Sequence, residues 1–351
     1  MLMIYGANGY SGELVAREAV QRGLSPVLAG RNGAAVSALA AELGLEHRVF
    51  GLDGGAALAA GLQGVSAVLH CAGPFIHTSA PMVAACLEAG AHYLDITGEI
   101  TVFEAVMRQR KRAEERKVAL LPGVGFDVVP TDCLAARLAR ALPDATHLDL
   151  AFVNVGGSLS RGTLATMIEA LPAAGAVRRA GKIVPVPVAA ESMELDLPVG
   201  RRTVMTIPWG DVSTAFHSTG IPNIRVFNGV HPARLRQLRR WRPLLPVLGW
   251  SPIKRALLAR VRRKVTGPSE EERRAGRVYL WGRVRNERGE EVTATASTPE
   301  GYTFTALSAA ECLRRVAAGE VPPGAWTPSK AFGADFVATI PGVEVGEVVR
   351  R

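Results

Sequence analysis

Short apolar runs alternate with amphipathic segments along the first 130 residues. Runs bounded by glycine or proline are typical of buried strands, whereas apolar positions that recur every three or four residues indicate helices. The pattern predicts strands at Leu2–Tyr5, Pro26–Ala29, Arg48–Leu52, Ala67–Cys71, His92–Ile96 and Val118–Leu121. It predicts helices between them at Glu13–Gln21, Ala34–Leu43, Ala56–Leu62, Pro81–Ala89 and Val102–Lys117. This alternation predicts an α/β fold with a doubly wound parallel sheet and right-handed crossovers.

Beyond Pro130 the alternation gives way to longer runs of strands. The pattern predicts helices at Leu134–Leu142, Leu164–Leu171 and Ala306–Ala317, a strand at His147–Val155, and a hairpin in which Arg277–Arg285 and Glu291–Ser297 flank the turn NERGE. Since 351 residues allow about two domains, we predict a first domain over residues 1–130 and a second, α+β domain over 131–324. The segment of about 325–351, after a proline-rich stretch, is expected to return to the first domain.

Three glycines separate the first predicted strand from the first predicted helix, in the stretch GANGYSG. Gly6 permits a tight turn, Gly9 permits the backbone to approach a pyrophosphate, and Gly12 permits close packing of helix on strand. The free N–H groups that begin the helix then face an anion. A glycine triplet also occurs in ordinary turns, but its place between a strand and a helix favours a Rossmann-type dinucleotide site.

An arginine stands where an acidic residue would indicate NAD. In NAD sites a carboxylate about 20 positions after the glycines receives the ribose 2′-hydroxyl, whereas an arginine accommodates a 2′-phosphate. Arg31 follows Gly12 by nineteen residues, and neither Asp nor Glu occurs between Glu18 and Glu42. The sequence therefore favours NADP, the alternative being that Arg31 is a solvated residue at a helix start.

Small residues and carboxylates follow three further predicted strands, in CAGPF (Cys71–Phe75), YLDITGE (Tyr93–Glu99) and PGVGFDVVPTD (Pro122–Asp132). The first motif would let the nicotinamide half of the cofactor approach. Glu99 and Asp127 are the candidate catalytic residues, because parallel strands bring their carboxyl ends to one edge of a sheet. The alternative, which we favour for each carboxylate singly, is helix capping: by Glu99 at the helix that follows it, and by Asp127 or Asp132 at the helix around Leu134.

Other classes of protein lack support in the sequence. None of the five tyrosines has a lysine four residues later, as short-chain reductases require, and neither GxSxG nor HExxH occurs. The four cysteines are scattered, which indicates neither a disulfide framework nor a zinc site. With the glycine motif at the start and no apolar run of about 20 residues, we expect a cytoplasmic protein.

Several ordered motifs together resemble the saccharopine-dehydrogenase-like oxidoreductases, particularly the branch with trans-acting enoyl reductases. The motifs are GANGYSG, AGRN, CAGPF, YLDITGE, GFDVVPTD, SRGTLATM (Ser160–Met167) and TPSKAFGADF. The resemblance implies an NADP-binding Rossmann domain with an inserted α+β domain. It also implies pyrophosphate binding by the GANGYSG turn, 2′-phosphate binding by Arg31, and a nicotinamide side at Ala72–Pro74. It supplies no proton donor, and saccharopine is not the expected substrate because the resemblance lies with the other branch.

The predicted cofactor-binding residues combine these arguments. They are Gly6, Ala7, Asn8, Gly9, Tyr10, Ser11, Gly12, Arg31, Asn32, Asp53, Cys71, Ala72, Gly73 and Pro74. We expect an NADP(H)-dependent oxidoreductase that transfers a hydride to or from a small-molecule or acyl (enoyl) substrate, the substrate class resting on the resemblance alone. The alternative is a non-catalytic NADP-binding sensor or partner-binding protein.

The net charge of +9 has a local origin. From Val212 to Ser269 the chain holds twelve Lys or Arg and neither Asp nor Glu. Our first interpretation of the basic segment 233–264 is a solvated or oligomer-facing element, so the protein could form a homodimer. Our second interpretation is a contact for a membrane surface or an acyl carrier. Nucleic acid ranks last and is not an expected partner. An acyl chain would be received by Leu244, Leu245, Val247, Leu248 and Trp250.

Overall fold

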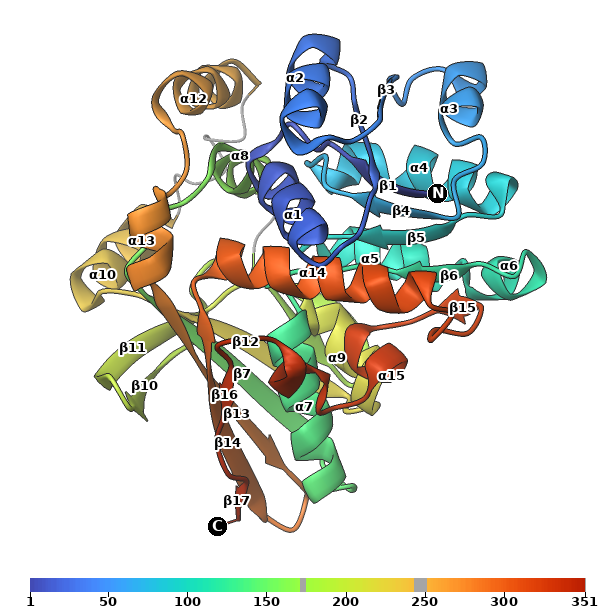
Figure 1. The fold of residues 1–351 in the computed structure, drawn as a ribbon. Coiled ribbons are helices and arrows are strands. Elements are labelled where there is room, and N and C mark those ends of the chain that lie inside the picture. Colours follow the sequence, from blue (N-terminus) through green and yellow to red (C-terminus); the bar gives the residue numbers. More distant parts are fainter. Residues whose placement is uncertain (171–174, 243–250, 351) are drawn as a thin grey trace. The chain divides into compact units, whose positions relative to one another are not determined.

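The computed structural model describes residues 1–170, 175–242 and 251–350, and its chain forms two compact units (Figure 1). Unit 1 comprises Met1–Val129 and Tyr302–Phe336, and unit 2 comprises Pro130–Gly301 and Val337–Arg351. The returning segment therefore differs from the expected 325–351. Of the residues discussed above, Leu171, Leu244, Leu245, Val247, Leu248 and Trp250 lie outside the described part of the chain.

Unit 1 is built on a seven-stranded parallel sheet. Its strands are β1 (Leu2–Tyr5), β2 (Val27–Gly30), β3 (His47–Val49), β4 (Ala67–His70), β5 (His92–Asp95), β6 (Ala119–Leu121) and β15 (Gly324–Ala325). Its helices are α1 (Tyr10–Gln21), α2 (Gly33–Leu43), α3 (Gly55–Gly61), α4 (Phe75–Ala89), α5 (Ile100–Met107), α6 (Arg110–Glu115), α14 (Gly301–Ala317) and α15 (Pro328–Phe332), and the short 3-10 helix η2 (Phe336–Thr339) follows.

The strand order is β15-β6-β5-β4-β1-β2-β3, which confirms the predicted doubly wound sheet. The central strands are buried on both faces, as expected of a parallel sheet with helices on both sides. From β1 the chain adds β2 and β3 on one side of the sheet and then β4, β5 and β6 on the other side. Ligands of such sheets bind at the carboxyl ends of the strands, beside the point where the direction reverses. The loops after β1, β2, β4, β5 and β6 are therefore the ones to examine for a site.

Helix α14 joins unit 1 through contacts with the loop that follows β6. Its Thr305 hydroxyl accepts a hydrogen bond from the Phe126 N–H (3.0 Å), and the Ser308 hydroxyl donates one to the Val124 carbonyl (2.8 Å). Farther along, β15 extends the sheet by pairing with β6. These side-chain contacts explain why the chain returns at Tyr302, a point that hydrophobic patterning alone does not mark.

The predicted long helix Val102–Lys117 is two helices, α5 and α6. Helix α5 ends at Met107, and α6 begins at Arg110. The buried positions Val102, Phe103, Val106 and Ala113 keep roughly helical spacing across the break. The spacing therefore predicts the buried face correctly, but it does not reveal the interruption.

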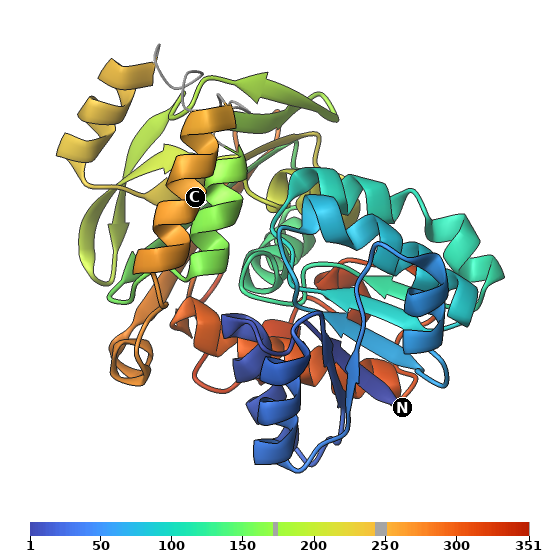
Figure 2. The same cartoon turned by 90° about the horizontal axis from the view of Figure 1, so that it is seen from above.

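Unit 2 contains a mixed sheet, which confirms the predicted second α+β architecture. Its strands are β7 (His147–Val155), β8 (Gly175–Arg179), β9 (Lys182–Val186), β10 (Ser192–Leu197), β11 (Gly200–Thr206), β12 (Asn223–Gly229), β13 (Arg277–Arg285), β14 (Glu291–Pro299), β16 (Glu344–Val345) and β17 (Val349–Arg350). Its helices are α7 (Val129–Ala141), α8 (Arg161–Ala170), α9 (Asp211–Thr219), α10 (Pro232–Trp241), α12 (Ser251–Lys264) and α13 (Glu270–Ala275). Within this unit α8 and α12 lie side by side (Figure 2).

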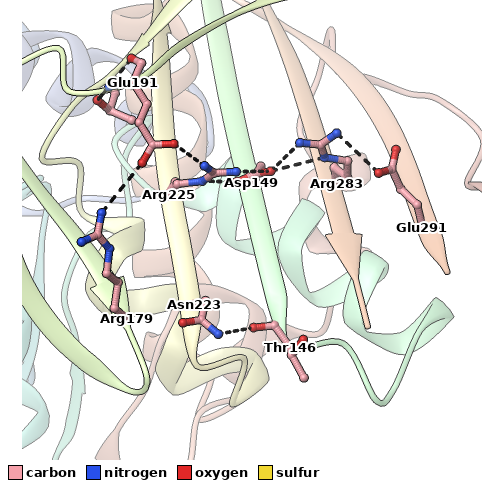
Figure 3. A network of polar contacts seen from close by, with 9 residues as sticks. Thr146, Asp149, Arg179, Glu191, Asn223, Arg225, Arg283 and Glu291 are labelled. Carbon is pink, nitrogen blue, oxygen red and sulfur yellow. Dashed lines mark hydrogen bonds and ion pairs between the residues drawn. The ribbon is translucent and has the colours of Figure 1, made fainter. Parts of the chain in front are cut away.

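The central strands of unit 2 have different environments on their two faces. On β13, a side chain at Gly282 would come within 2.6 Å of Leu138 in α7, so α7 packs closely on that face. The neighbouring residue, Arg283, points to the opposite face because side chains alternate along a strand. There it belongs to a row of charged residues that crosses the sheet (Figure 3).

Asp149 on β7 is the centre of this row and is only 2% exposed. Its carboxylate accepts hydrogen bonds from Arg225 on β12 (2.8 and 3.0 Å) and from Arg283 on β13 (2.8 Å). Glu191 and Glu291 pair with the outer sides of these two arginines. Burial tends to raise the pKa of Asp149, but the two guanidinium groups outweigh it and lower that pKa. The row is thus a satisfied structural network.

Candidate dinucleotide-binding site

The loop between β1 and α1 is shaped by two glycines that tolerate no side chain. Gly6 has φ +82°, a left-handed conformation, and a Cβ on Gly12 would overlap the carbonyl oxygen of Gly6. The Gly6 N–H donates to the Ala29 carbonyl (2.7 Å), which ties the loop to the end of β2. Helix α1 then begins at Tyr10, and the first N–H groups of a helix have no acceptor within it. The loop therefore has the form of an anion-binding turn.

This turn touches the loop that follows β4. A Cβ on Gly6 would lie 2.8 Å from both the backbone nitrogen and the Cβ of Ala72. The Cys71 N–H donates to the Tyr5 carbonyl (2.7 Å) and continues the pairing of β1 with β4. The structure thus brings the predicted pyrophosphate residues together with the predicted nicotinamide-side residues Cys71–Pro74.

A hydrogen-bond relay holds the carbonyl group of Ala72. The Thr78 hydroxyl donates to this carbonyl (2.7 Å), and Nε2 of His70 lies 3.0 Å from the same hydroxyl. Because the hydroxyl proton is used on Ala72, His70 donates to the hydroxyl oxygen through Nε2–H. Burial lowers the pKa of His70 to about 3, so the ring is neutral near pH 7. The relay fixes the turn where the nicotinamide half was predicted to lie.

Arg31 lies just beyond β2, exposed to solvent. It makes no hydrogen bond or ion pair with any residue that the structure describes. Its charge and that of Asp53 both act on the Tyr5 hydroxyl: burial raises the pKa of Tyr5, Arg31 opposes the rise, and Asp53 adds to it. Arg31 and Asp53 therefore lie near the same end of β1, with a cation available for a phosphate group.

Two asparagines predicted to bind the cofactor have different surroundings. The Oδ1 atom of Asn8 lies 3.0 Å from where a Cβ of Gly30 would stand, so the small residue at the end of β2 makes room for Asn8 in the turn. Asn32 is the N-cap of α2, and its side chain accepts a hydrogen bond from the Ala35 N–H (3.3 Å). The side chain of Asn32 is thus a helix cap.

Glu99 makes no side-chain cap bond with the helix that follows it, the helix on whose N-terminus its charge was considered to act. It stands at the N-cap position of α5, but no side-chain cap bond forms there. Its two carboxylate oxygens instead accept hydrogen bonds from the N–H groups of Phe75 (2.8 Å) and Ile76 (2.6 Å), at the start of α4. Glu99 therefore neutralises the positive end of α4 and fixes the turn Cys71–Pro74.

Asp95, at the end of β5, is a connecting residue that sequence reasoning did not select. Its carboxylate accepts hydrogen bonds from the Tyr93 hydroxyl (2.6 Å) and from the N–H groups of Thr97 (3.0 Å) and Gly123 (2.8 Å). Burial raises the pKa of Asp95 to about 6 despite these bonds. The signal in the sequence was an aspartate at the end of an apolar strand, within the motif already singled out.

Asp127 lies in the loop after β6, half-buried and against Gly98, where an added Cβ would stand 2.8 Å from its Oδ2 atom. Its carboxyl group has no hydrogen-bond partner within the described ranges, and it does not form the cap bond that we considered. The other candidate cap, Asp132, lies inside the first turn of α7 and accepts a hydrogen bond from Ser218. Burial, and secondarily the charge of Glu99, raises the pKa of Asp127 to about 7. Asp127 thus holds a proton near neutral pH, as general acids do.

Tyr10 contributes backbone and ring to different contacts. Its backbone begins α1, while its ring packs edge-on against Tyr302 at the start of α14, with centroids 5.0 Å apart.

Taken together, the loops after β1, β2, β4, β5 and β6 offer helix N–H groups, a cation and a carboxyl group at one sheet edge. These residues fit a phosphorylated dinucleotide. No cluster of three or more metal-ligating side chains occurs among the described residues.

A family model matches the first third of the chain, and a solved structure matches its whole length. Residues 2–121 match the family model described as the saccharopine dehydrogenase NADP binding domain, which confirms the resemblance seen in the motifs. Among solved structures, the apo histidine-tagged saccharopine dehydrogenase (L-Glu forming) from Saccharomyces cerevisiae matches with a TM-score of 0.69 and 12% identity, covering 100% of this chain and 99% of that one. At such low identity this match shows the fold alone.

Curated relatives come from mycobacteria. A Mycobacterium tuberculosis protein named provisionally as a trans-acting enoyl reductase is 31% identical over 186 residues, which cover 49% of this chain and 44% of the relative. Another from that species, named trans-acting enoyl reductase, is 29% identical over 197 residues, covering 52% and 47% respectively. The aligned part is thus less than half the length of these relatives. No helix within the described ranges is long and apolar enough to span a membrane.

Proposed function

We propose that this protein is an NADP(H)-dependent oxidoreductase that reduces an enoyl thioester or a related unsaturated acyl compound. The observation that carries the proposal is the close approach of Gly6 to Ala72, which supports a pyrophosphate site at the glycine turn beside the loop after β4. The name shared by the mycobacterial relatives supports the substrate class. The matched NADP-binding family supports the cofactor.

The chain's own residues divide the work of binding. The N–H groups that begin α1 bind the pyrophosphate, and Arg31 pairs with the 2′-phosphate. Glu99 and the relay from His70 through Thr78 hold the turn Cys71–Pro74 in place for the nicotinamide half. The bound cofactor supplies the hydride.

Asp127 is the residue proposed to move the proton. Reduction of an enoyl thioester adds a hydride to the β-carbon and a proton to the α-carbon, so that the double bond is consumed and the charge balances. The Asp127 carboxyl, protonated in part at neutral pH, gives its proton to the α-carbon and regains one from solvent. This role explains why its carboxyl group makes no hydrogen bond with the described residues.

A panel of substrates tests the proposal. Purified protein is incubated with NADPH and crotonyl, carbonyl or imine compounds, and cofactor oxidation is followed by absorbance. We expect turnover of crotonyl thioesters, with a loss of about 10²- to 10⁴-fold in kcat for Asp127→Asn, the range of general acid catalysis. The control is Glu115→Gln, at the exposed end of α6, which should leave kcat unchanged.

The second candidate is a non-catalytic NADP-binding sensor or partner-binding protein. It is favoured by the fact that Glu99 and Asp95 are both engaged in structural hydrogen bonds, which leaves few groups for chemistry. Tight NADPH binding without turnover on any compound of the panel would support it over the enzyme.

A further inference from the structure

Helix α14 meets two loops of the candidate site within its first two turns. The ring of Tyr302 packs edge-on against Tyr10, the first residue of α1, with centroids 5.0 Å apart. Two residues later, the ring of Phe304 packs edge-on against Phe126 in the loop after β6, with centroids 6.0 Å apart. All four residues belong to unit 1. A single helix from late in the chain thus supports both the glycine turn and the loop that carries Asp127.

Thr305 holds the backbone immediately before Asp127. Its hydroxyl oxygen accepts a hydrogen bond from the Phe126 N–H (3.0 Å), and the residue is only 8% exposed. A Cβ added to Gly125 would stand 3.0 Å from Cγ2 and 3.2 Å from Oγ1 of Thr305. Residues 125 and 126 therefore lie directly against Thr305. Because Asp127 is the next residue in the chain, the place of its carboxyl group depends on this contact.

Asp127 and the residues before it also contact the loop after β5. A Cβ added to Gly98 would stand 2.8 Å from the Oδ2 atom of Asp127, and one added to Gly125 would stand 3.4 Å from the Cβ of Ile96. Burial, and secondarily the charge of Glu99, raises the pKa of Asp127 to about 7. A small displacement of the loop after β6 would therefore change both the position of this carboxyl group and its exposure to water.

The beginning of the same loop has anchors of its own. The Gly123 N–H donates to the carboxylate of Asp95 (2.8 Å), and the Val124 N–H donates to the backbone carbonyl of Asp95 (2.7 Å). The Ser308 hydroxyl, one turn after Thr305 on α14, donates to the Val124 carbonyl (2.8 Å). Loss of the Ser308 bond leaves Val124 attached to Asp95. Ser308 is thus a matched control for Thr305, on the same helix and against the same loop.

We propose that Thr305 is a positioning residue, which holds the loop after β6 so that the Asp127 carboxyl stands where it can give its proton to the substrate. The proposal rests on the proposed function, since it concerns the group that we assign as proton donor. A buried N–H group that loses its acceptor is costly, so the backbone at Phe126 moves to find another. A displacement of about 1 Å in a reacting group lowers a rate by about 10²-fold.

Three variants separate positioning from stability. Thr305→Val keeps the shape of the side chain but removes its hydroxyl, Thr305→Ser keeps the hydroxyl, and Ser308→Ala removes the other hydrogen bond. We expect kcat with a crotonyl thioester to fall about ten- to hundredfold in Thr305→Val and to stay within about twofold of the parent in the other two. The affinity for NADPH, measured by fluorescence titration, should be unchanged in all three, because none of them touches the glycine turn.

A second measurement follows Asp127 without any turnover. Urea unfolding from pH 4 to pH 8 compares the parent with Asp127→Asn, and Thr305→Val with the double variant Thr305→Val/Asp127→Asn. A loop that has moved exposes the carboxyl to water, which brings its folded-state pKa closer to the ordinary 3.8. The pH-dependent difference within the Thr305→Val pair should therefore be smaller than in the parent pair. The same pair made in Ser308→Ala should show the parent difference.

Several outcomes would overturn the proposal. Equal falls in kcat for Thr305→Val and Ser308→Ala, or a loss of NADPH affinity parallel to that of kcat, would show a general loosening of unit 1. A parent-like kcat or a parent-like pH dependence in Thr305→Val would show that Asp127 keeps its place without the hydroxyl. If the parent reduces no compound of the panel, the proposed function fails, and the pH dependence of unfolding alone decides the role of Thr305. Thr305→Ala replaces the valine variant if circular dichroism shows that the latter does not fold.

Discussion

The two carboxylate oxygens of Glu99 accept hydrogen bonds from the N–H groups of Phe75 (2.8 Å) and Ile76 (2.6 Å) at the start of α4. A residue in the loop after β5 thus determines the conformation of the loop after β4. Since Ala72 in that loop touches Gly6, the connection continues to the pyrophosphate turn. Glu99 is in this view a positioning residue, and its loss should be felt at the cofactor.

Replacing Glu99 with Ala should therefore weaken both folding and NADPH binding. Two N–H groups lose a charged acceptor, and we expect a fall of about 1–3 kcal/mol in the free energy of unfolding. Urea unfolding and NADPH fluorescence titration give the two quantities. Glu115→Ala, at the exposed end of α6, is the control and should change neither. If Glu99→Ala and the control behave alike, Glu99 does not hold the turn.

The stability of the protein should depend on pH through Asp127. Its pKa is raised from the ordinary 3.8 to about 7, so between these values the folded state holds a proton that the unfolded state has lost. The stabilisation linked to this group is complete below pH 4 and is lost as the pH rises through 7. Asp95, with a pKa of about 6, acts in the same direction.

A comparison with Asp127→Asn isolates the contribution of Asp127. The asparagine variant cannot titrate, so the difference in unfolding free energy between it and the parent should shift in favour of the variant from pH 4 to pH 8. Urea unfolding across this range measures it. A difference that does not vary with pH would show that the folded protein leaves the pKa of Asp127 unshifted. In Glu99→Gln, which removes a negative charge, the transition should move to lower pH.

Gly12→Ala should damage the pyrophosphate turn. The new Cβ would overlap the carbonyl oxygen of Gly6, and neither backbone segment can move without breaking the pairing at β1. We expect a loss of about 1–3 kcal/mol of stability, as for other overpacked sites, and NADPH binding weakened more than tenfold. Gly55→Ala is the control, since no atom lies within 4 Å of its added Cβ. Equal NADPH affinity in both variants would contradict the proposed turn.

Arg31→Asp should change the cofactor preference. It removes the cation proposed for the 2′-phosphate and offers a carboxylate to a 2′-hydroxyl. A charge-assisted hydrogen bond contributes about 1.5–3 kcal/mol, which corresponds to a roughly ten- to hundredfold weaker affinity for NADPH, while NADH binds as well or better. Isothermal titration with both cofactors provides the measurement, with Arg116→Asp as control. Unchanged NADPH affinity would mean that Arg31 is an ordinary surface residue.

Asp149→Ala should destabilise unit 2 strongly. It leaves Arg225 and Arg283 without their buried counter-ion, a change that typically costs about 3–5 kcal/mol. The exposed ion pair of Arg288 with Glu290 gives the control, because removing Glu290 should destabilise the protein far less. Urea unfolding of the two variants compares them. Because the pKa of Asp149 is lowered, the stabilisation by the row should be lost at acid pH, below about pH 4.

Local patterning determined much of unit 1. The alternation of apolar strands and amphipathic helices predicted the parallel sheet, because a central strand that is buried on both faces consists of apolar residues in sequence. The predicted strands Leu2–Tyr5 and His147–Val155 agree with β1 and β7 residue for residue. The glycines of GANGYSG were also readable, since a left-handed turn and a close approach each require glycine at a fixed place.

Long-range contacts decided what local pattern could not. Nothing around Glu99 indicates that its carboxylate reaches back to α4, and nothing around Ser308 or Thr305 indicates that α14 returns to the loop after β6. The raised pKa of Asp127 likewise depends on burial and on Glu99, which only the folded chain supplies. The sequence by itself therefore determined the sheet and the glycine turn between β1 and α1, whose requirements are local. Only the tertiary structure decided the roles of the carboxylates, because a carboxylate takes its hydrogen-bond partners and its pKa from residues distant in the chain.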